Sequence, residues 1–292
     1  LFTTFKYGAI IWEKLRMVLY MTDIVIIGGG PAGISAALTA AQRGKTSVII
    51  TSAPEDSLLW KAEKIDNYPG LPGITGKDLI AVLTKHAEGV GVKFVRGKAL
   101  SIIPMGNRFG VSVGMDFVDC GAVILATGVA RGKAFPGEKE FLGAGVSYCA
   151  TCDGMLYREK NIAVIGLSAE APEEAEFLRS IGCNVEYFDG KRAKKYEIKG
   201  AERVESLTAD GESYPVEGVF ILRAGVAPDT LLPGLETDKG HIRADAEMAT
   251  NIPGVFAAGD CIGAPYQVPK AAGEGNIAGI SAARYVESRA GE

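Results

Sequence analysis

A glycine-rich turn between an apolar run and an alanine-rich run constrains this chain more than any other feature. The apolar run Ile24 to Ile27 leads into Gly28, Gly30 and Gly33, and the segment Ile34 to Ala41 follows. This order is typical of a strand, a tight turn and a helix. Glycine at these positions permits the turn, the close approach of a pyrophosphate to the backbone, and tight packing of helix on strand. The pattern predicts a dinucleotide site at the N-terminus of the helix, where free N–H groups face the phosphates.

A second strand is expected at Thr46 to Ile50, at the distance typical of a βαβ unit. This spacing favours a dinucleotide site over a glycine-rich turn that binds nothing. The acidic residue that commonly binds ribose hydroxyls after this strand is missing, because Thr51 and Ser52 stand there. We therefore expect hydroxyl or backbone contacts to the ribose.

A related but altered unit begins in the middle of the chain. A strand is expected at Asn161 to Gly166, a helix at Pro172 to Ser180 and a further strand at Asn184 to Phe188. Ser168 occupies the place where glycine normally lets a pyrophosphate touch the backbone. Glu170 adds negative charge, which at about 4 Å opposes a phosphate by roughly 1 to 4 kcal/mol in a surface-like dielectric. The unit resembles a nucleotide site that has lost its nucleotide; a variant loop that still binds one is the alternative.

The pair Cys149 and Cys152, in the stretch CATCDG, stands just ahead of this second unit. Such a pair can be half of a zinc site, a structural disulfide or a redox-active centre. Zinc needs two further ligands, and the cysteines at 120, 183 and 261 have no paired spacing, so no metal is expected and these three are interpreted as small buried residues. A redox pair acts through a thiolate, and Asp153 is the natural candidate to protonate a departing thiolate.

Near the C-terminus, Ile252 to Asp260 is expected to form a strand that ends in Gly-Asp, and Ala271 to Val286 a helix. An acidic residue at a strand end can bind a polyol, or it can cap the helix that follows. The fragment alone leaves both open.

Size and composition exclude several classes of protein. A length of 292 residues favours two domains, and a net charge of -4 argues against a nucleic-acid binder. The sequence contains no apolar stretch of about 18 residues, so no membrane span is expected. Five scattered cysteines fit a protein of the reducing cytoplasm better than a disulfide scaffold. Residues 1–20 lack a small-residue cleavage site and are interpreted as an N-terminal appendage or an upstream mis-start, with a short amphipathic helix as the alternative.

The stretches IIGGGPAG, ILATG, CATCDG and GVFAAGD, in this order and at these spacings, resemble the low-molecular-weight thioredoxin reductases. The resemblance covers residues 21–292 and implies an α/β fold of two doubly wound, Rossmann-like three-layer domains. It implies that residues 21–127 and 226–292 form an FAD-binding domain. This domain would be split by an inserted domain of residues 128–225, which carries the CxxC pair on a degenerate pyridine-nucleotide fold.

The resemblance also implies FAD as the cofactor, thioredoxin as the partner and a homodimer. The cofactor-binding residues that it implies are Gly28, Gly30, Pro31, Ala32, Gly33, Thr51, Ser52, Asn67, Thr127, Gly128, Asp260, Gln267 and Val268. Asp260 would bind the ribityl chain, and Gln267 with Val268 would meet the pyrimidine side of the flavin. Cys152 would face the flavin, Cys149 would attack the disulfide of thioredoxin, and Asp153 would be the general acid.

The chain departs from the family at its second nucleotide site. The family's basic HRR motif, which binds the 2'-phosphate of NADPH, corresponds to Tyr187 to Gly190, where no such motif occurs, and the insert is shortened after Asp189. A subgroup of the family with this kind of loss takes electrons from reduced ferredoxin, and this chain is similar to it. The run Lys191 to Lys195 is either a solvated face or a docking site for an acidic protein such as ferredoxin.

Four functions therefore stay open at this point. The first is a thioredoxin reductase that uses reduced ferredoxin, and the second is one that uses NADPH. The third is a dithiol oxidase that runs the same centre backwards and passes electrons to oxygen. The fourth is a flavin-bound sensor without enzymatic activity, which the intact CATCDG stretch disfavours.

Overall fold

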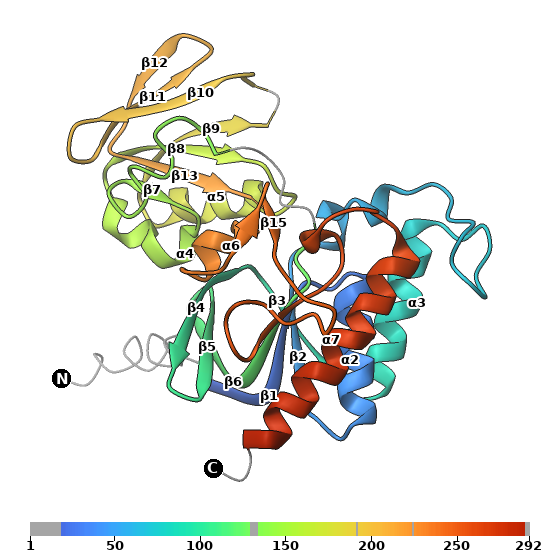
Figure 1. The fold of residues 1–292 in the computed structure, drawn as a ribbon. Coiled ribbons are helices and arrows are strands. Elements are labelled where there is room, and N and C mark those ends of the chain that lie inside the picture. Colours follow the sequence, from blue (N-terminus) through green and yellow to red (C-terminus); the bar gives the residue numbers. More distant parts are fainter. Residues whose placement is uncertain (1–18, 129–133, 191, 224, 290–292) are drawn as a thin grey trace, which may run out of the picture.

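The computed structural model describes residues 19–128, 134–190, 192–223 and 225–289. These residues form two α/β bodies, each built on its own parallel sheet (Figure 1). The larger body contains residues from both ends of the described chain, and the smaller one contains residues from its middle. The predicted fold class, with one Rossmann-like domain split by another, is confirmed.

The large body is built on one sheet with the strand order β3-β2-β1-β6-β5-β4, in which β16 also pairs with β6. Strands β1, β2, β3, β6 and β16 run parallel, and β4 and β5 add an antiparallel extension. The strands are β1 (Leu19–Ile27), β2 (Ser47–Thr51), β3 (Lys93–Arg96), β4 (Ala99–Met105), β5 (Arg108–Val113), β6 (Asp116–Leu125) and β16 (Val255–Ala257). This is the doubly wound arrangement, in which ligands bind outside the carboxyl ends of the strands.

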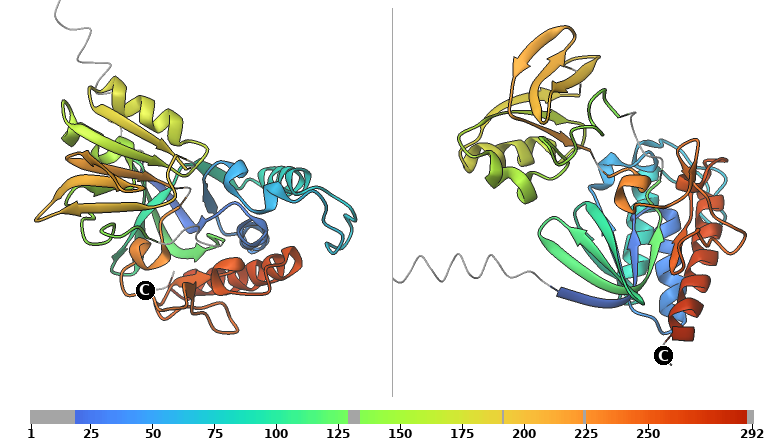
Figure 2. Two further views of the ribbon diagram at one scale, coloured as in Figure 1. Left: turned by 90° about the horizontal axis from the view of Figure 1, so that it is seen from above. Right: turned by 60° about the vertical axis from the view of Figure 1, so that its left-hand side comes forward.

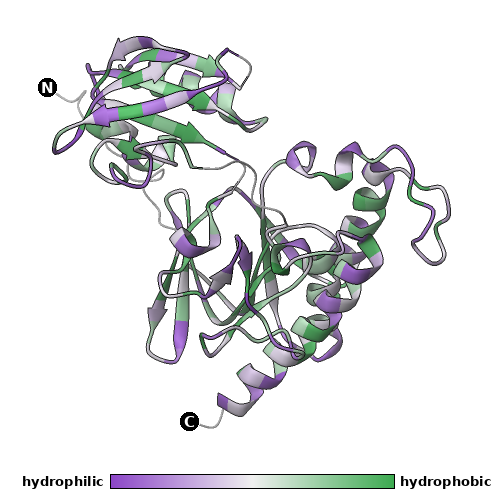
Figure 3. Cartoon of the chain, turned by 45° about the horizontal axis from the view of Figure 1, so that its top comes forward, coloured by the Kyte–Doolittle hydropathy of each residue, from purple (hydrophilic) through white to green (hydrophobic). Residues whose placement is uncertain are grey.

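Alternating residues of β1 fill two separate cores, because successive side chains of a strand point to opposite faces. Ile24 and Ile26 pack against the helices, whereas Val25 and Ile27 pack against the extension and the segment around Leu231. The helices are α2 (Pro31–Gln42), α3 (Gly76–Gly89) and α7 (Val268–Arg289), which Figure 2 shows on one side of the sheet. Figure 3 shows apolar residues concentrated in the strands and on the inner sides of these helices.

Helices α2 and α7 approach each other closely because glycines replace larger residues at their contact. A Cβ atom at Gly275 would lie 2.0 Å from the carbonyl oxygen of Ala32, and one at Gly279 would lie 2.6 Å from that of Ala36. Asn276 Nδ2 also donates a hydrogen bond of 2.8 Å to Thr39 Oγ1 across the contact. The C-terminal helix is therefore held against the helix that begins in the first glycine turn.

The small body is built on a parallel sheet with the order β7-β13-β8-β9, and a three-stranded antiparallel sheet with the order β10-β11-β12 accompanies it. Ile162 and Val164 pack on α5, whereas Ala163 and Ile165 pack toward residues of β10 and β11. The elements are β7 (Val146–Ser147), α4 (Ala150–Asp153), η3 (Gly154–Tyr157), β8 (Asn161–Gly166), α5 (Ala171–Ser180), β9 (Asn184–Asp189), β10 (Tyr196–Gly200), β11 (Val204–Ala209), β12 (Glu212–Pro215) and β13 (Gly218–Leu222).

Short elements complete the large body and lie near the junction of the two (Figure 1). They are η1 (Pro54–Asp56), η2 (Leu59–Lys61), α6 (Pro228–Leu231), β14 (Thr237–Asp238), β15 (His241–Ile242) and η4 (Asp260–Ile262). The predicted boundaries near residues 127 and 225 fall in segments that connect the two sheets, and they stay predictions. The interpretation of residues 1–20 concerns mostly residues outside the described ranges, because the description starts with Leu19 in β1.

The strand expected from Ile252 to Asp260 is shorter than predicted. Gly254 and Gly259 have φ angles of 85° and 84°, in the left-handed region that extended strands do not use. Only Val255–Ala257 between them is a strand, and Asp260 begins the short η4 helix instead. The expected helices and the remaining strands are all present, with ends that differ by a few residues.

Of the helices that the structure describes, none combines the length and the apolar composition that crossing a membrane would require.

The α2–α7 contact predicts opposite effects for two glycines of the same helix. Gly275→Ala should destabilise the protein by about 1 to 3 kcal/mol, because the added methyl group would overlap backbone atoms of α2. The matched change Gly273→Ala meets no atom within 4 Å and should stabilise the protein by about 0.5 to 1 kcal/mol. Urea unfolding curves measure both, and equal midpoints for the two variants would show that the helices are not in close contact.

Candidate active site

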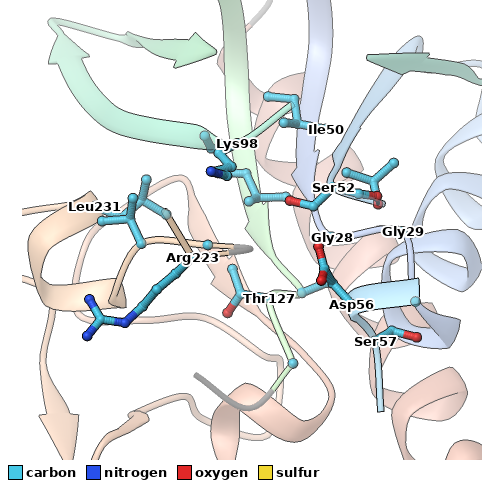
Figure 4. A pocket seen from close by; sticks show the side chains of 18 of the residues that line it. Gly28, Gly29, Ile50, Ser52, Asp56, Ser57, Lys98, Thr127, Arg223 and Leu231 are labelled. Atoms are coloured by element: carbon cyan, nitrogen blue, oxygen red, sulfur yellow. Dashed lines mark hydrogen bonds between the residues drawn. The ribbon is translucent and has the colours of Figure 1, made fainter. Parts of the chain in front are cut away.

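A cavity of about 970 Å³ lies at the junction of the two bodies, outside the carboxyl ends of the parallel strands. The first glycine turn forms part of its wall, and residues of the small body such as Tyr148 and Arg223 form another part. In Figure 4, Thr127 lies between Arg223 on one side and Asp56 with Ser57 on the other. The cavity has the location and size expected for a large dinucleotide ligand.

The three glycines of the first turn have different physical roles. Gly28 has a φ angle of 118°, and a Cβ atom there would lie 2.1 Å from the carbonyl oxygen of Ala126 on the neighbouring β6 segment. A Cβ atom at Gly33 would lie 1.9 Å from the carbonyl oxygen of Gly28, so this glycine permits the helix to start directly behind the turn. A Cβ atom at Gly30 would meet no protein atom within 4 Å. Gly30 therefore leaves space for a ligand, while Gly28 and Gly33 shape the backbone.

Most of the predicted cofactor-binding residues meet in this cavity. Its lining includes Gly28, Gly30, Pro31, Thr51, Ser52, Thr127, Gly128 and Asp260. Ala32 and Gly33 are buried in the first turn of α2 and do not line the cavity. Asn67, Gln267 and Val268 do not line it either, but Asn67 Nδ2 donates a hydrogen bond of 2.5 Å to Gln267 Oε1, so these two predicted residues are brought together.

Several charged residues of the cavity were missed by the sequence analysis, and three of them are clustered in the large body near the first glycine turn or the strand beside it. Asp56, Arg96 and Lys98 line it, and Asp56 Oδ2 is buried without a hydrogen-bond partner among the described residues. A ligand that carries both hydroxyl groups and phosphates fits such a wall, because hydroxyls donate to a carboxylate and phosphates accept from basic groups. The residues present therefore fit FAD. Asp56 follows the second strand by five residues, and no pattern in the sequence separates it from the neighbouring acidic Glu55.

The Gly259-Asp260 turn is held by two charged residues of α7. Lys270 Nζ donates to the carbonyl oxygens of Gly259 and Gly263 at 3.2 and 2.5 Å, and Glu274 accepts from the Gly259 N–H at 2.9 Å. Burial raises the pKa of Asp260, and nearby Lys270 partly offsets this effect. The backbone on either side of Asp260 is thus held, and Asp260 lines the cavity, where a carboxylate can accept hydrogen bonds from a polyol.

Cys149 and Cys152 form a disulfide at the start of α4. Cys149 is the N-cap of this helix, and the Cys152 N–H points at Cys149 Sγ at 3.1 Å. Cys149 is 9% exposed, whereas Cys152 is exposed, and its Sγ lies 3.3 Å from the carbonyl oxygen of Gly114 in the β5–β6 turn of the large body. Neither sulfur lines the cavity, although the adjacent Tyr148 does.

Asp153 lies next to the pair and is held by a serine that the sequence analysis missed. Ser147 Oγ donates a hydrogen bond of 2.7 Å to Asp153 Oδ2, and the Cys149 N–H donates to the same Ser147 Oγ at 3.1 Å. Ser147 is 3% exposed, so water does not compete for these bonds. Cys149 and Asp153 therefore share one buried hydroxyl group, and the disulfide joins Cys152 to Cys149.

A buried ion pair holds Tyr148, the residue that precedes Cys149 in the chain. Glu138 is 3% exposed and binds Arg223 through both oxygens, at 2.6 and 2.9 Å. Tyr148 Oη donates to Glu138 Oε1 at 3.0 Å, and burial together with the Glu138 charge raises the pKa of this tyrosine. The segment that carries Cys149 is thus held to both connections between the two bodies, because Glu138 lies between β6 and β7 and Arg223 follows β13.

The other three cysteines are buried free thiols, as predicted. Burial raises the pKa of Cys120 to about 12 and that of Cys261 to about 11, and it also raises the pKa of Cys183. These thiols are protonated at neutral pH and are poor nucleophiles. Within the described ranges, no group of three or more His, Cys, Asp or Glu residues is placed to hold a metal ion.

A dinucleotide cavity under a glycine turn, together with a CxxC disulfide on a second Rossmann-like body, defines a disulfide oxidoreductase of the flavoprotein type. The sequence matches the pyridine nucleotide-disulphide oxidoreductase family over residues 22–192 and 190–275. It is 33% identical to a thioredoxin reductase from Aquifex aeolicus (strain VF5) over 275 residues, which cover 82% of this chain and 85% of that protein.

Solved structures agree with this assignment. The chain is similar to a ferredoxin-flavin thioredoxin reductase from Clostridium acetobutylicum, with a TM-score of 0.88, 36% identity and coverage of 93% of this chain and 99% of that one. It is also similar to the thioredoxin reductase of Lactococcus lactis, with a TM-score of 0.56, 30% identity and coverage of 91% and 99%. The chain belongs to the thioredoxin reductase family. It is a FAD-dependent oxidoreductase, as the sequence predicted.

The open space at Gly30 predicts a variant that folds but does not hold FAD. Gly30→Val places a side chain in the cavity without meeting protein atoms near its Cβ, so the pyrophosphate would lose its contact with the backbone. Gly89→Ala, also in open space but at the end of α3, is the matched control. Flavin absorbance per protein should fall about tenfold or more in the first variant and not in the second, while circular dichroism stays unchanged in both. Full flavin content in Gly30→Val would contradict this view of the turn.

Proposed function

We propose that this chain is a thioredoxin reductase that takes electrons from reduced ferredoxin and passes them through FAD and the Cys149/Cys152 pair to the disulfide of thioredoxin. One observation carries the choice of donor. The backbone N–H of Ala169, in the turn where a pyridine nucleotide would place its pyrophosphate, donates a hydrogen bond of 2.9 Å to Asp56 Oδ1 of the large body. We infer that this carboxylate takes the place that a nucleotide phosphate would have.

Other features of this second turn also disfavour a nucleotide. Ser168 puts a side chain where glycine normally lets a pyrophosphate touch the backbone, and Glu170 adds a carboxyl group at the start of α5. Arg192 is the described basic residue nearest the end of β9, but its guanidinium binds Glu186 at 2.5 Å and lies 4.3 Å from the Phe188 ring centre. The group that could have bound a 2'-phosphate is thus engaged by neighbours.

The likeness to the Clostridium acetobutylicum enzyme supports the same donor. That protein is named a ferredoxin-flavin thioredoxin reductase, and its TM-score with this chain is higher than that of the Lactococcus lactis enzyme at nearly the same coverage. Energetics permit the donor as well. The reduction potential of a plant-type ferredoxin, about -400 mV, lies about 130 mV below that of thioredoxin, about -270 mV. This difference corresponds to roughly 6 kcal/mol for two electrons.

The residues of the chain divide the work as follows. Gly28, Gly30 and the carboxyl ends of the strands hold FAD, which when bound supplies two electrons that reduce the Cys149–Cys152 disulfide to two thiols. The Cys149 thiolate then attacks one sulfur of the thioredoxin disulfide, so a mixed disulfide forms and one thioredoxin thiolate departs. Asp153 takes the proton that leaves the Cys149 thiol and passes it to this departing thiolate. The Cys152 thiolate attacks Cys149 Sγ, which restores the disulfide and releases dithiol thioredoxin.

The exposure of the two sulfurs requires movement of the small body during this cycle. In the described arrangement Cys152 is exposed and Cys149 is buried, and neither sulfur lines the FAD cavity. For Cys152 to meet the flavin and Cys149 to meet thioredoxin, as the resemblance implies, the small body must adopt at least two orientations. The role of each sulfur stays a prediction.

The surface beside the pair suits an apolar patch on thioredoxin. Met155 and Leu156 follow the CATCDG stretch and are 61% and 68% exposed, and Met115 in the β5–β6 turn is 59% exposed. Exposed large apolar side chains that gather beside a reactive group are typical of protein docking sites. We place thioredoxin there.

The basic run from Lys191 to Lys195 supports ferredoxin docking only weakly. Lys191 lies outside the described residues, and Arg192 is engaged as described above. Lys194 and Lys195 are exposed, but their backbone N–H groups bind the acidic Asp210. The docking site of ferredoxin, the homodimer and the cytoplasmic location all stay predictions.

The donor assignment predicts a sharp contrast between two reductants. Reduced ferredoxin should bleach the flavin rapidly in anaerobic stopped flow, whereas NADPH and NADH at saturating concentration should bleach it at least about 100-fold more slowly, because the second nucleotide site is occupied by Asp56. Rapid bleaching by NADPH would contradict the assignment and leave an NADPH-dependent thioredoxin reductase with an unusual nucleotide turn.

The contact of Ser147 with Asp153 predicts a coupled loss of activity. Asp153→Asn should slow oxidation of the reduced pair by thioredoxin by about 10²- to 10⁴-fold, since an amide cannot deliver the proton. Ser147→Ala should slow it by about tenfold in the native background but by less than about twofold in the Asp153→Asn background, because its effect acts through the carboxyl group. Ser147→Thr keeps the hydroxyl and should keep the rate. Equal effects of Ser147→Ala in both backgrounds would show that Ser147 does not act through Asp153.

A further inference from the structure

The second glycine-type turn contacts the large body through its own anion-binding groups. The Ala169 N–H points at Asp56 Oδ1 at 2.9 Å, although the two residues are 113 positions apart in the chain. Backbone N–H groups just ahead of a helix bind anions, because they have no partner within the helix. Asp56 therefore supplies, from the same chain, the negative charge that a bound nucleotide would have supplied.

A second contact lies one turn further along the same helix. Lys98 Nζ binds Glu174 Oε1 at 2.6 Å, and the two side chains are only 8% and 21% exposed. Glu174 belongs to the first turn of α5, and Lys98 lies between β3 and β4 of the large body. A pair with this little exposure is screened by solvent much less than a surface ion pair.

Both contacts join the two bodies at one place. Asp56 and Lys98 line the FAD cavity, and Leu167, which precedes Ser168 in the second turn, lines it too. The unpartnered Asp56 Oδ2 is buried at this wall, whereas Oδ1 holds the turn. The remaining interbody ion pair among those described, Lys139 with Asp229 at 3.0 Å, is exposed by contrast, with side-chain exposures of 64% and 45%.

We propose that Asp56 and Lys98 are positioning residues that together form a clasp: Asp56 binds the second glycine-type turn and Lys98 binds the start of α5. The clasp holds the small body, with its disulfide, in the arrangement described here. This proposal deepens the proposed function and rests on it for its consequence, since the disulfide must leave this arrangement to be reduced. The clasp sets how readily it does so. In this proposal, the second glycine-type turn serves as a contact between the two bodies instead of a nucleotide site.

The first test measures the hydrogen bond itself by amide hydrogen exchange on oxidised, FAD-loaded protein. Asp56→Ala should speed exchange of the Ala169 amide by about tenfold or more, because the N–H loses its acceptor. Asp56→Asn keeps an acceptor oxygen and should stay within about twofold of the native rate. Unchanged exchange in Asp56→Ala, or equal acceleration in both variants, would overturn the proposal.

The second test measures the position of the small body. Spin labels on Lys85→Cys and Glu197→Cys, which are exposed residues of the two bodies, report the distance between them by pulsed electron resonance, since the three native thiols are buried. The double variant Asp56→Ala/Lys98→Met should broaden the distance distribution or add a second peak. The matched variant Lys139→Met, which removes the exposed ion pair, should not.

These outcomes are separate from the choice of electron donor. A distribution as narrow as the native one in Asp56→Ala/Lys98→Met, or equal broadening in Lys139→Met, would refute the clasp. Neither result depends on ferredoxin or NADPH, so the donor assignment and the clasp can fail independently. Lys98→Arg, made in protein that keeps Asp56, keeps the positive charge and should show a distance distribution as narrow as the native one. A narrow distribution in this variant would show that a change at position 98 does not by itself disturb the fold.

Discussion

The close approach of the first glycine turn to the end of β6 determines where this enzyme works. Gly28 can adopt its positive φ angle and pass against the Ala126 carbonyl only because it has no side chain. Thr127 and Gly128 follow directly and thus enter the cavity, and Gly33 lets α2 begin immediately behind the turn. The α2–α7 contact then brings the C-terminal helix, with Lys270 and Glu274, to the Asp260 side of the same cavity. One backbone contact therefore places residues from both ends of the chain.

The small body has the same order of strand, turn and helix, but Ser168 stands where the middle glycine of the turn would leave space for a pyrophosphate. A Cβ atom at Gly166 would lie 2.2 Å from Tyr187 Oη. The packing of Tyr187, and not contact with a ligand, therefore favours glycine at this position. The Ala169 N–H in this turn instead donates to Asp56 of the large body. In our proposal this turn serves as a contact between the two bodies instead of a nucleotide site, and the contact affects the position of the Cys149–Cys152 disulfide.

Local patterns in the sequence were sufficient for the fold and for much of the site. The apolar runs, the glycine spacing and the CATCDG stretch each act within about thirty residues, so the βαβ units and the cavity could be predicted, and the residues predicted to be catalytic lie close together. Asp56, Lys98 and Arg223 could not, because their partners Ala169, Glu174 and Glu138 are 76 to 113 residues away and depend on how the bodies meet. The strand before Asp260 was overestimated because two glycines with positive φ angles limit it. Ser147 carries no signal beyond being a small polar residue, and only the structure shows that it is buried and donates to Asp153.

The central claim is that the described arrangement is one of at least two, and that in it the disulfide is outside the reach of the flavin. A short thiol cross-linker between Lys139→Cys and Asp229→Cys, whose native side chains meet at 3.0 Å, would lock this arrangement. After anaerobic photoreduction of the flavin, alkylation and mass spectrometry report whether the Cys149–Cys152 disulfide has opened. We predict that the disulfide stays closed in the cross-linked protein and opens in the same variant without the cross-linker. Opening at equal rates in both would contradict it.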